Sequence, residues 1–432
     1  MAAPLYWRVS WRKGRQRMNL SIERIEILLL IAAFVAMTAR RFKLPYMVGL
    51  VLAGIVVAAF PNLSNLTLTK ELVFTVFLPP LIFEAAIQME WKALRRDLPP
   101  ILTLATLGVV LAAGLTAAGV HFLLGWEWPP ALMIGVLISA TDPVSVIATF
   151  KEAAVEGRLR MLVEAESLFN DGTVAVLFSV GLILIGGSVL TPWQVASSFL
   201  ATFVGGIVCG GSIAWLILRV VGHTDDHLVE ITFSSIAAYG SFLVAEHFHL
   251  SGVMATLVAG ILFGNYGSCG AITDKGRAEV LSFWEYVAFV ANSLIFLLVG
   301  VRLAHQNFGA VWLPLVVVIP LVLLGRALAV YGCCLPFARS GWRVEKNHQH
   351  ILVWGGLRGA LALALVYGLP PTIAHRGAII TVVFGVVAFS VLVQGLTIPW
   401  LLRRLGVLHL PVNEAQNIGA NSESSSTGGE IS

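Results

Sequence analysis

A polar cluster interrupts an apolar stretch of the sequence at "EAESLFNDG", residues 164–172. Within it Ser167, Asn170 and Asp171 are spaced i, i+3 and i+4, which places them on one face of a helix. Hydroxyl, amide and carboxylate oxygens are the ligands that a hard cation accepts when it sheds water. Asp171 has no lysine or arginine within one helical turn. In apolar surroundings a proton or a cation must therefore neutralise it, and we predict that the two compete for this carboxylate.

The composition places this cluster in a membrane protein. Of 432 residues, 57% are hydrophobic and only 12% are charged, with a mean hydropathy of +0.86, whereas soluble proteins carry about 25% charged residues. The net charge of +4 does not indicate a nucleic-acid partner, because the basic residues mostly separate apolar segments. The four cysteines show no disulfide or metal-site spacing. We expect membrane lipids as partners and no cofactor.

Apolar stretches of spanning length predict about thirteen transmembrane helices. They lie at residues 25–39, 46–60, 71–88, 99–124, 130–150, 162–187, 192–221, 229–247, 250–266, 281–303, 311–334, 350–369 and 377–402. The loops after the odd-numbered helices carry most of the lysines and arginines, which predicts a cytoplasmic C-terminus and an N-terminus outside. Residues 1–21 form a basic extension that opposes this rule, and residues 405–432 are expected to be a disordered cytoplasmic tail.

Two of the predicted helices contain breaks near mid-depth. In the fifth, Thr141 and Asp142 precede Pro143, which removes a backbone donor and disfavours helix before it. In the twelfth, three glycines surround Arg358 within residues 355–359. If the seventh helix joins two six-helix halves, both breaks fall in the fifth helix of a half, and the halves run in opposite senses. This pattern predicts an inverted repeat with crossed broken helices, typical of secondary transporters.

Five further ionisable residues lie well inside the predicted spans, where such residues usually have a function. They are Glu84, Asp142, Glu166, Arg326 and Arg358. A capping role for Asp142 is compatible with ion binding, and Glu84 fits either an ion site or a vestibule. Glu166 and Arg358 are interpreted as neutralising each other. Arg326 is more typical of a structural pair or of a ligand to backbone carbonyls.

Three motifs, "ATDPVSV", "ESLFNDG" and "GGLRGALAL", occur in this order in predicted helices five, six and twelve. Together with "FLPPLIFEAA" and "NSLIFLLVG", they make the chain similar to the NhaP/NHE branch of the monovalent cation:proton antiporters. The resemblance covers a membrane transport domain at about residues 22–404 and implies an all-α, NhaA-like antiporter fold. It also implies a homodimer, with a dimerisation part at about 22–90 and 192–303 and a core part at about 99–187 and 311–404.

The resemblance carries roles for individual residues. It implies that Asp171 is the carboxylate that exchanges proton and cation, and that Asp142 and Thr141 belong to the unwound crossing. Ser167 and Glu84 would complete the surroundings of the transported ion.

Three more residues receive roles from the same resemblance. Asn170 would support the ion site, and Glu166 and Arg358 would form an ion bridge between helices six and twelve. Because Asn170 cannot ionise, only one carboxylate stands at this pair of positions in "FNDG". The resulting expectation is electroneutral, one-for-one exchange of H⁺ for Na⁺, with Li⁺ and K⁺ left open, by alternating access in the cell (inner) membrane, in the service of pH homeostasis.

Two other classes of protein would also place acidic residues within membrane helices. A cation channel would arrange them around a pore, although the paired broken helices and Arg358 argue against that architecture. An intramembrane aspartyl protease would pair Asp142 with Asp171. The sequence lacks a Gly-x-Gly-Asp stretch, however, and Asp142 is followed by proline. We therefore expect a transporter that is not an enzyme.

Overall fold

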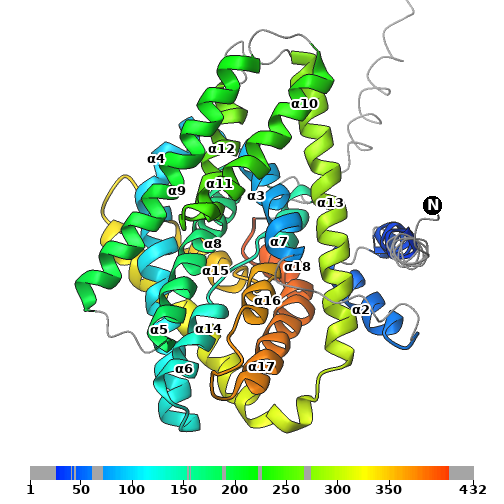
Figure 1. The fold of residues 1–432 in the computed structure, drawn as a ribbon. Coiled ribbons are helices and arrows are strands. Elements are labelled where there is room, and N and C mark those ends of the chain that lie inside the picture. The colour runs from blue at the N-terminus through cyan, green and yellow to red at the C-terminus, as the bar shows by residue number, and fades with distance from the viewer. Residues whose placement is uncertain are drawn as a thin grey trace, which may run out of the picture.

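The computed structural model describes residues 26–407 apart from 40, 43–44, 61–71, 153–154, 156, 187–190, 222–225 and 267–273. Over this part of the chain it is a bundle of helices, and the only extended pairing is an isolated bridge between Asp142 and Leu357 (Figure 1). The prediction of an all-α protein is confirmed. The basic extension at 1–21 and the tail from residue 408 lie outside the described residues.

The first part of the chain carries helices up to the predicted polar cluster. These are a helix at Glu26–Ala39, α2 (Tyr46–Val57), the π-helical η1 (Leu72–Phe77), α3 (Leu78–Ile87), α4 (Trp91–Thr103), the π-helical η2 (Leu104–Gly108), α5 (Val109–Leu124), α6 (Trp128–Leu137), α7 (Val144–Glu152) and α8 (Arg158–Ile185).

The second part continues the bundle to the last described residues. It contains α9 (Pro192–Val221), α10 (His227–Ser235), the π-helical η3 (Ile236–Gly240), α11 (Ser241–His247), α12 (Gly252–Tyr266), α13 (Asp274–Ala304), the 3₁₀ turn η5 (Phe308–Val311), α14 (Trp312–Cys334), the 3₁₀ turn η6 (Leu335–Phe337), α15 (Lys346–Trp354), α16 (Ala360–Tyr367), α17 (Arg376–Phe389), the π-helical η7 (Ser390–Gln394) and α18 (Gly395–Arg404).

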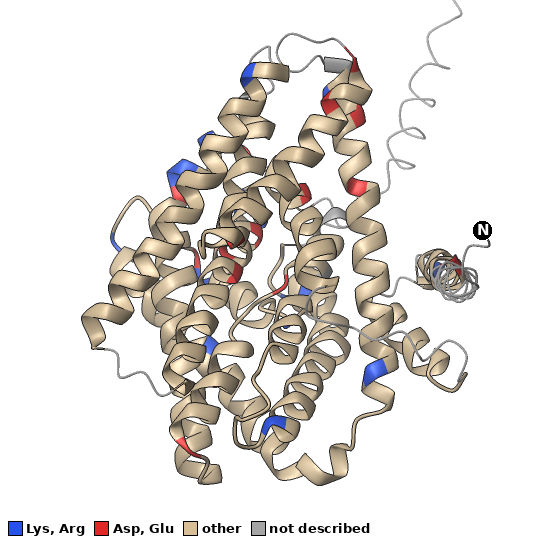
Figure 2. Cartoon of the chain, in the orientation of Figure 1, with Lys and Arg blue, Asp and Glu red and all other residues tan. Residues whose placement is uncertain are grey.

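Seven helices among the described residues are long and apolar enough to cross a membrane. Charged residues are sparse along the ribbons of the bundle (Figure 2). Each predicted span falls on a helix, either continuous or interrupted. The fourth begins earlier than predicted, at Trp91, and continues through Pro99 and Pro100. Those prolines remove donors only from the carbonyls of Arg95 and Arg96, which are exposed near the helix end and can bond to water.

The helices pack mainly within two groups. In one group α2 packs on α13, while α3 and α9 pack on α12; in the other, α5 packs on α6 and α14, and α8 packs on α4 and α6. The crossing of α2 and α13 requires glycine, because a Cβ on Gly54 would lie 2.1 Å from the carbonyl oxygen of Leu297 and 2.8 Å from the Cα of Gly300. Small residues that allow such close approach are a common feature of helix contacts in membranes.

Both predicted interruptions are present. The fifth predicted helix is divided into α6 and α7, and the twelfth into α15 and α16. The two non-helical segments run antiparallel, and the backbone N–H of Asp142 donates to the carbonyl of Leu357 at 2.7 Å. The predicted crossing of two broken helices is therefore confirmed.

Candidate functional site

Asp142 holds the amino-terminal ends of two half-helices at the crossing. Its Oδ1 accepts the backbone N–H of Val144 at 2.9 Å, at the start of α7. Its carboxylate also packs against Gly359, directly before Ala360, the first residue of α16. A Cβ on Gly359 would lie 2.0 Å from Oδ2 of Asp142, so only glycine leaves room for this carboxylate. The capping interpretation of Asp142 is thus confirmed, and the negative charge stands where helix dipoles are positive.

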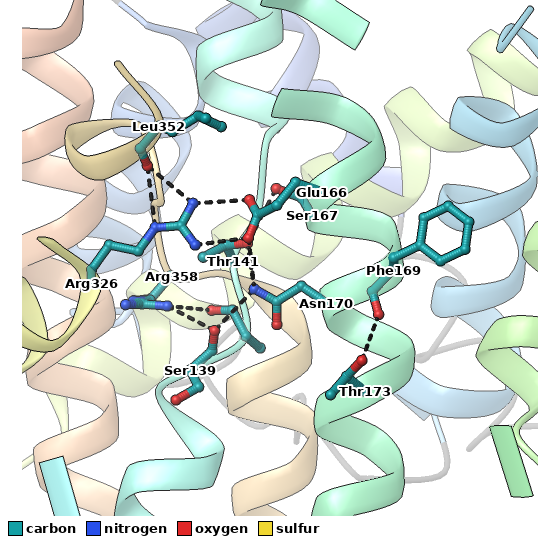
Figure 3. Close-up of polar contacts among 11 residues, drawn as sticks. Ser139, Thr141, Glu166, Ser167, Phe169, Asn170, Thr173, Arg326, Leu352 and Arg358 are labelled. Carbon is teal, nitrogen blue, oxygen red and sulfur yellow. Dashed lines mark hydrogen bonds and ion pairs between the residues drawn. The ribbon is translucent and has the colours of Figure 1, made fainter. Parts of the chain in front are cut away.

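Arg358 occupies the opposite kind of helix end. Its Nη1 donates to the carbonyl of Ser139 at 2.9 Å and to that of Ala140 at 3.3 Å, just beyond the carboxyl end of α6 (Figure 3). These carbonyls are left without helical partners by the break that follows. A buried guanidinium satisfies them and offsets the negative end of the helix dipole.

The predicted ion pair between Glu166 and Arg358 is wrong. Glu166 pairs instead with Arg326 of α14, at 2.7 Å between Nη1 and Oε1 and 2.9 Å between Nη2 and Oε2. Arg326 also donates from Nε and Nη2 to the carbonyl of Leu352 near the end of α15, at 3.2 and 3.0 Å (Figure 3). Arg358 donates to the carbonyls of Ser139 and Ala140 in the first break, so Glu166 pairs with Arg326 of α14. The interpretation of Arg326 as a pair member and carbonyl ligand is confirmed.

Hydroxyl and amide groups link α8 to the first break. Asn170 donates from Nδ2 to Thr141 Oγ1 at 2.9 Å and to the carbonyl of Ser139 at 3.2 Å. Thr141 Oγ1 donates in turn to Ser167 Oγ at 3.2 Å. All four residues are buried (Figure 3). Ser167 and Asn170 therefore contact Thr141 directly, and through it they fix the shape of the break.

Asp171 faces a cavity beside this network. Its Oδ1 is buried and has no hydrogen-bond partner among the residues that the structure describes. The carboxylate lies within electrostatic range of Asp142 and Glu166. The polar and charged residues on the cavity wall are Glu84, Gln88, Thr141, Asp142, Glu164, Asp171, Glu285 and Asn292. The structure thus brings together four of the predicted site residues, Asp171, Asp142, Thr141 and Glu84, whereas Ser167 and Asn170 lie behind Thr141.

Several cavity residues were missed by the sequence analysis. Glu285, Ala288, Phe289 and Asn292 line the cavity from α13, in the other group of helices. Their spacing of i, i+3, i+4 and i+7 is one face of a helix, and two polar residues on one stripe of a long apolar helix were the available signal. Asn292 is about nine-tenths buried, and within the described part of the chain its Oδ1 has no hydrogen-bond partner. The cavity therefore lies between the two groups of helices.

Crossed interrupted helices beside a buried, carboxylate-lined cavity define a membrane transporter of the broken-helix type. The family model for the transmembrane sodium/hydrogen exchanger matches residues 27–404. The chain belongs to the sodium/hydrogen exchanger family. It is accordingly an integral membrane transporter and not an enzyme.

Relatives and solved structures agree with this assignment. The chain is 38% identical over 375 residues to the low-affinity Na⁺/H⁺ antiporter NhaS1 of Synechocystis, covering 85% of this chain and 70% of the relative. It is 35% identical over 400 residues to the Na⁺/H⁺ antiporter NhaH of Halobacillus aidingensis, covering 89% of this chain and 98% of the relative. The fold is similar to that of the sodium proton antiporter MjNhaP1 of Methanocaldococcus jannaschii, with a TM-score of 0.73 and 21% identity. The match covers 90% of this chain and 99% of that structure.

Proposed function

We propose that this chain exchanges Na⁺ for H⁺ across a membrane and that Asp171 is the carboxylate that carries either ion. One observation carries the proposal: Asp171 lines the cavity and its buried Oδ1 has no hydrogen-bond partner among the residues that the structure describes, whereas the neighbouring Glu166 is neutralised by Arg326. An unpaired carboxylate in apolar surroundings is stabilised by a proton or by a cation. Relatives described as Na⁺/H⁺ antiporters support the choice of ions.

The transported ion would be held by oxygens around the first break. Asp171 and Asp142 supply carboxylates, and Thr141 supplies its hydroxyl, with Ser167 bonded to it at 3.2 Å. Glu84 lies on the same cavity wall and completes the surroundings of the ion. Asn170 orients Thr141, which is the supporting role expected for it. All of these ligands are oxygens, as a small hard cation requires.

Coupling of the two fluxes follows from the charge of Asp171. With neither ion bound, Asp171 is an uncompensated negative charge that is costly to move through an apolar barrier. A proton or a Na⁺ neutralises that charge. The site therefore switches from facing one side of the membrane to facing the other only when it is occupied. Alternating access would then drive exchange without ATP, one Na⁺ for one H⁺.

The moving and stationary parts would follow the two groups of helices. We assign the core part to about residues 99–187 and 311–404, and the dimerisation part of a homodimer to about 22–90 and 192–303. The cavity between the groups supports this division. We further propose the cell membrane as the location, with the C-terminus in the cytoplasm, because most basic residues lie in the loops on that side.

Purified protein in proteoliposomes tests the function directly. With an acidic lumen and a pH-sensitive dye inside, adding Na⁺ outside is expected to raise the lumenal pH, with saturation at high Na⁺. Li⁺ and K⁺ added in turn establish the ion preference. Cation uptake without proton movement, or flux that does not saturate, would favour a channel and overturn the proposal.

A further inference from the structure

The break at residues 355–359 leaves backbone groups that the helices on either side of it do not satisfy. Near its start, the carbonyl of Trp354 accepts a hydrogen bond from Nε2 of Gln394 at 3.0 Å. Near its end, the N–H of Arg358 donates to Oγ of Ser390 at 2.8 Å. Both partners belong to η7, so one short segment of the last helix holds the break at two points.

These two contacts form one closed chain. Ser390 Oγ donates a hydrogen bond to Oε1 of Gln394 at 2.8 Å. The hydroxyl thus accepts one hydrogen bond, from the backbone N–H of Arg358, and donates another to the glutamine. The glutamine then uses its amide nitrogen for Trp354. The side chains of Ser390 and Gln394 are 0% and 3% exposed. Every bond in the chain has a donor and an acceptor in the correct sense, and in a buried setting each is costly to lose.

The segment that this chain holds is the one that contacts Asp142. Between its two anchored ends, Leu357 offers its carbonyl to the N–H of Asp142 at 2.7 Å. At the end of the segment, Gly359 packs so closely on the carboxylate of Asp142 that a Cβ there would lie 2.0 Å from Oδ2. A shift of the segment therefore displaces both the backbone and the side chain of a residue on the cavity wall.

The local helix geometry supports a dedicated role. Residues 390–394 are π-helical between α17 and α18, and such single turns within α-helices often mark functional sites. Figure 1 shows α17 running beside α16, so η7 is next to the second break. No ionisable side chain takes part in the chain, and the segment that it holds meets the ion site at Asp142 and through Gly359 on the cavity wall.

We propose that Ser390 and Gln394 are positioning residues that set the cation affinity of the site by fixing the 355–359 segment beneath Asp142. The inference rests on the proposed cation exchange, which it refines. If these residues only stabilised the fold, their loss would reduce the amount of folded protein, while the molecules that remained would bind Na⁺ as before.

Gln394→Met and Ser390→Ala test the inference in proteoliposomes. Gln394→Met keeps the length of the side chain but removes the donor to Trp354, and Ser390→Ala removes one oxygen. We expect each to raise the apparent KM for Na⁺ by at least about fivefold, with the maximal rate changed by less than about twofold. Thr397→Val is the matched control, because Thr397 Oγ1 accepts the indole N–H of Trp354 at 2.8 Å and donates to the carbonyls of Val393 and Gln394, but bonds to no backbone group of the 355–359 break. We expect its KM to equal that of the wild type.

A second readout measures binding without transport. Na⁺ raises the melting temperature of a protein that binds it, and we expect this Na⁺-induced rise to be reduced in both variants and retained in Thr397→Val. A lower melting temperature with an unchanged Na⁺-induced rise and unchanged KM would overturn the inference. If Gln394→Met does not fold, Ser390→Ala decides by the same criteria. Absence of Na⁺-driven proton movement in the wild type would instead overturn the proposed function.

Discussion

Arg326 and Glu166 form a bidentate ion pair that joins α14 to α8, with contacts of 2.7 and 2.9 Å. Their side chains are 7% and 1% exposed. Because Arg326 also donates to the carbonyl of Leu352, the same guanidinium fixes the end of α15 beside the second break. The pair therefore links three helices and neutralises Glu166, which supports the proposal that Asp171 is the carboxylate that carries the transported ion.

Breaking this pair is expected to destabilise the protein strongly. Removal of one member of a buried pair leaves an uncompensated charge, which costs about 3–5 kcal/mol in soluble proteins. Glu166→Ala and Arg326→Ala should each lower the melting temperature in detergent, and the double variant should lose less than the sum. A parallel cycle with Glu166→Ala and Arg358→Ala serves as the control. Additivity in the first cycle, or equal coupling in both, would contradict the assignment of Arg326 as the partner.

The sequence predicted Arg358 as the partner of Glu166, whereas the structure pairs Glu166 with Arg326. This difference separates what the sequence can predict from what depends on helix packing. The positions of both breaks and the buried charges follow from proline, glycine and isolated ionisable residues within apolar stretches. Which arginine meets Glu166 depends on how α14, α8 and the breaks pack together. Arg358 donates to the carbonyls of Ser139 and Ala140. These carbonyls lack helical partners because of the first break, which is far from Arg358 in the sequence.

The same limit applies to the residues that support the site. Thr141, Asp142 and Asp171 stand out in the sequence because they are polar within predicted spans or sit at a break. Ser390 and Gln394 do not, since uncharged polar residues are common in membrane helices and only their bonds to the second break give them a role.

Asp171→Asn is expected to abolish Na⁺/H⁺ exchange while the protein remains folded. Asparagine keeps the shape and one oxygen but cannot release or take up a proton. The measurement is proton movement in proteoliposomes, together with gel filtration to check folding. Glu127→Gln, which neutralises an exposed carboxylate at the start of α6 outside the cavity, is the control and should exchange normally. Retention of more than about a tenth of the wild-type rate by Asp171→Asn would refute the role of this carboxylate.

Asp142 caps α7 and is proposed to bind the ion, and substitution can separate these two roles. Asparagine caps helix ends nearly as well as aspartate, whereas alanine loses the cap at a cost of roughly 0.5–2 kcal/mol. We expect Asp142→Asn to keep a melting temperature near that of the wild type but to bind Na⁺ more weakly, and Asp142→Ala to lose both stability and affinity. Equal Na⁺ affinity in Asp142→Asn and the wild type would restrict this residue to its structural role.

Competition between proton and cation for one carboxylate predicts a specific pH dependence. As the pH falls, a growing fraction of Asp171 is protonated, so more Na⁺ is needed to displace the proton. The apparent KM for Na⁺ should rise on acidification and approach about tenfold per pH unit while the maximal rate changes little. Initial rates over a series of Na⁺ concentrations, at several pH values, measure this. A constant KM with a falling maximal rate would point to a separate regulatory site.

The stoichiometry follows from how each acidic group near the cavity is held. Glu166 is neutralised by Arg326, and Asp142 accepts the N–H of Val144 and packs against Gly359. Asn170, next to Asp171, carries no charge. In the proposed scheme Asp171 alone exchanges its ion, while Glu84, Glu164 and Glu285 on the cavity wall keep one protonation state, so the site has the same charge with H⁺ or Na⁺ bound. Moving a net charge through a membrane potential involves about 2.3 kcal/mol per 100 mV, so electrogenic exchange would reach a different final Na⁺ gradient when a potential is imposed. We expect the final gradient in proteoliposomes clamped with K⁺ and valinomycin to be the same at every potential.

Asn170→Asp tests the reason for this, because a second ionisable group at that position should make the final gradient depend on voltage if it also takes up a proton. A voltage-dependent gradient in the wild type would rule out exchange through Asp171 alone.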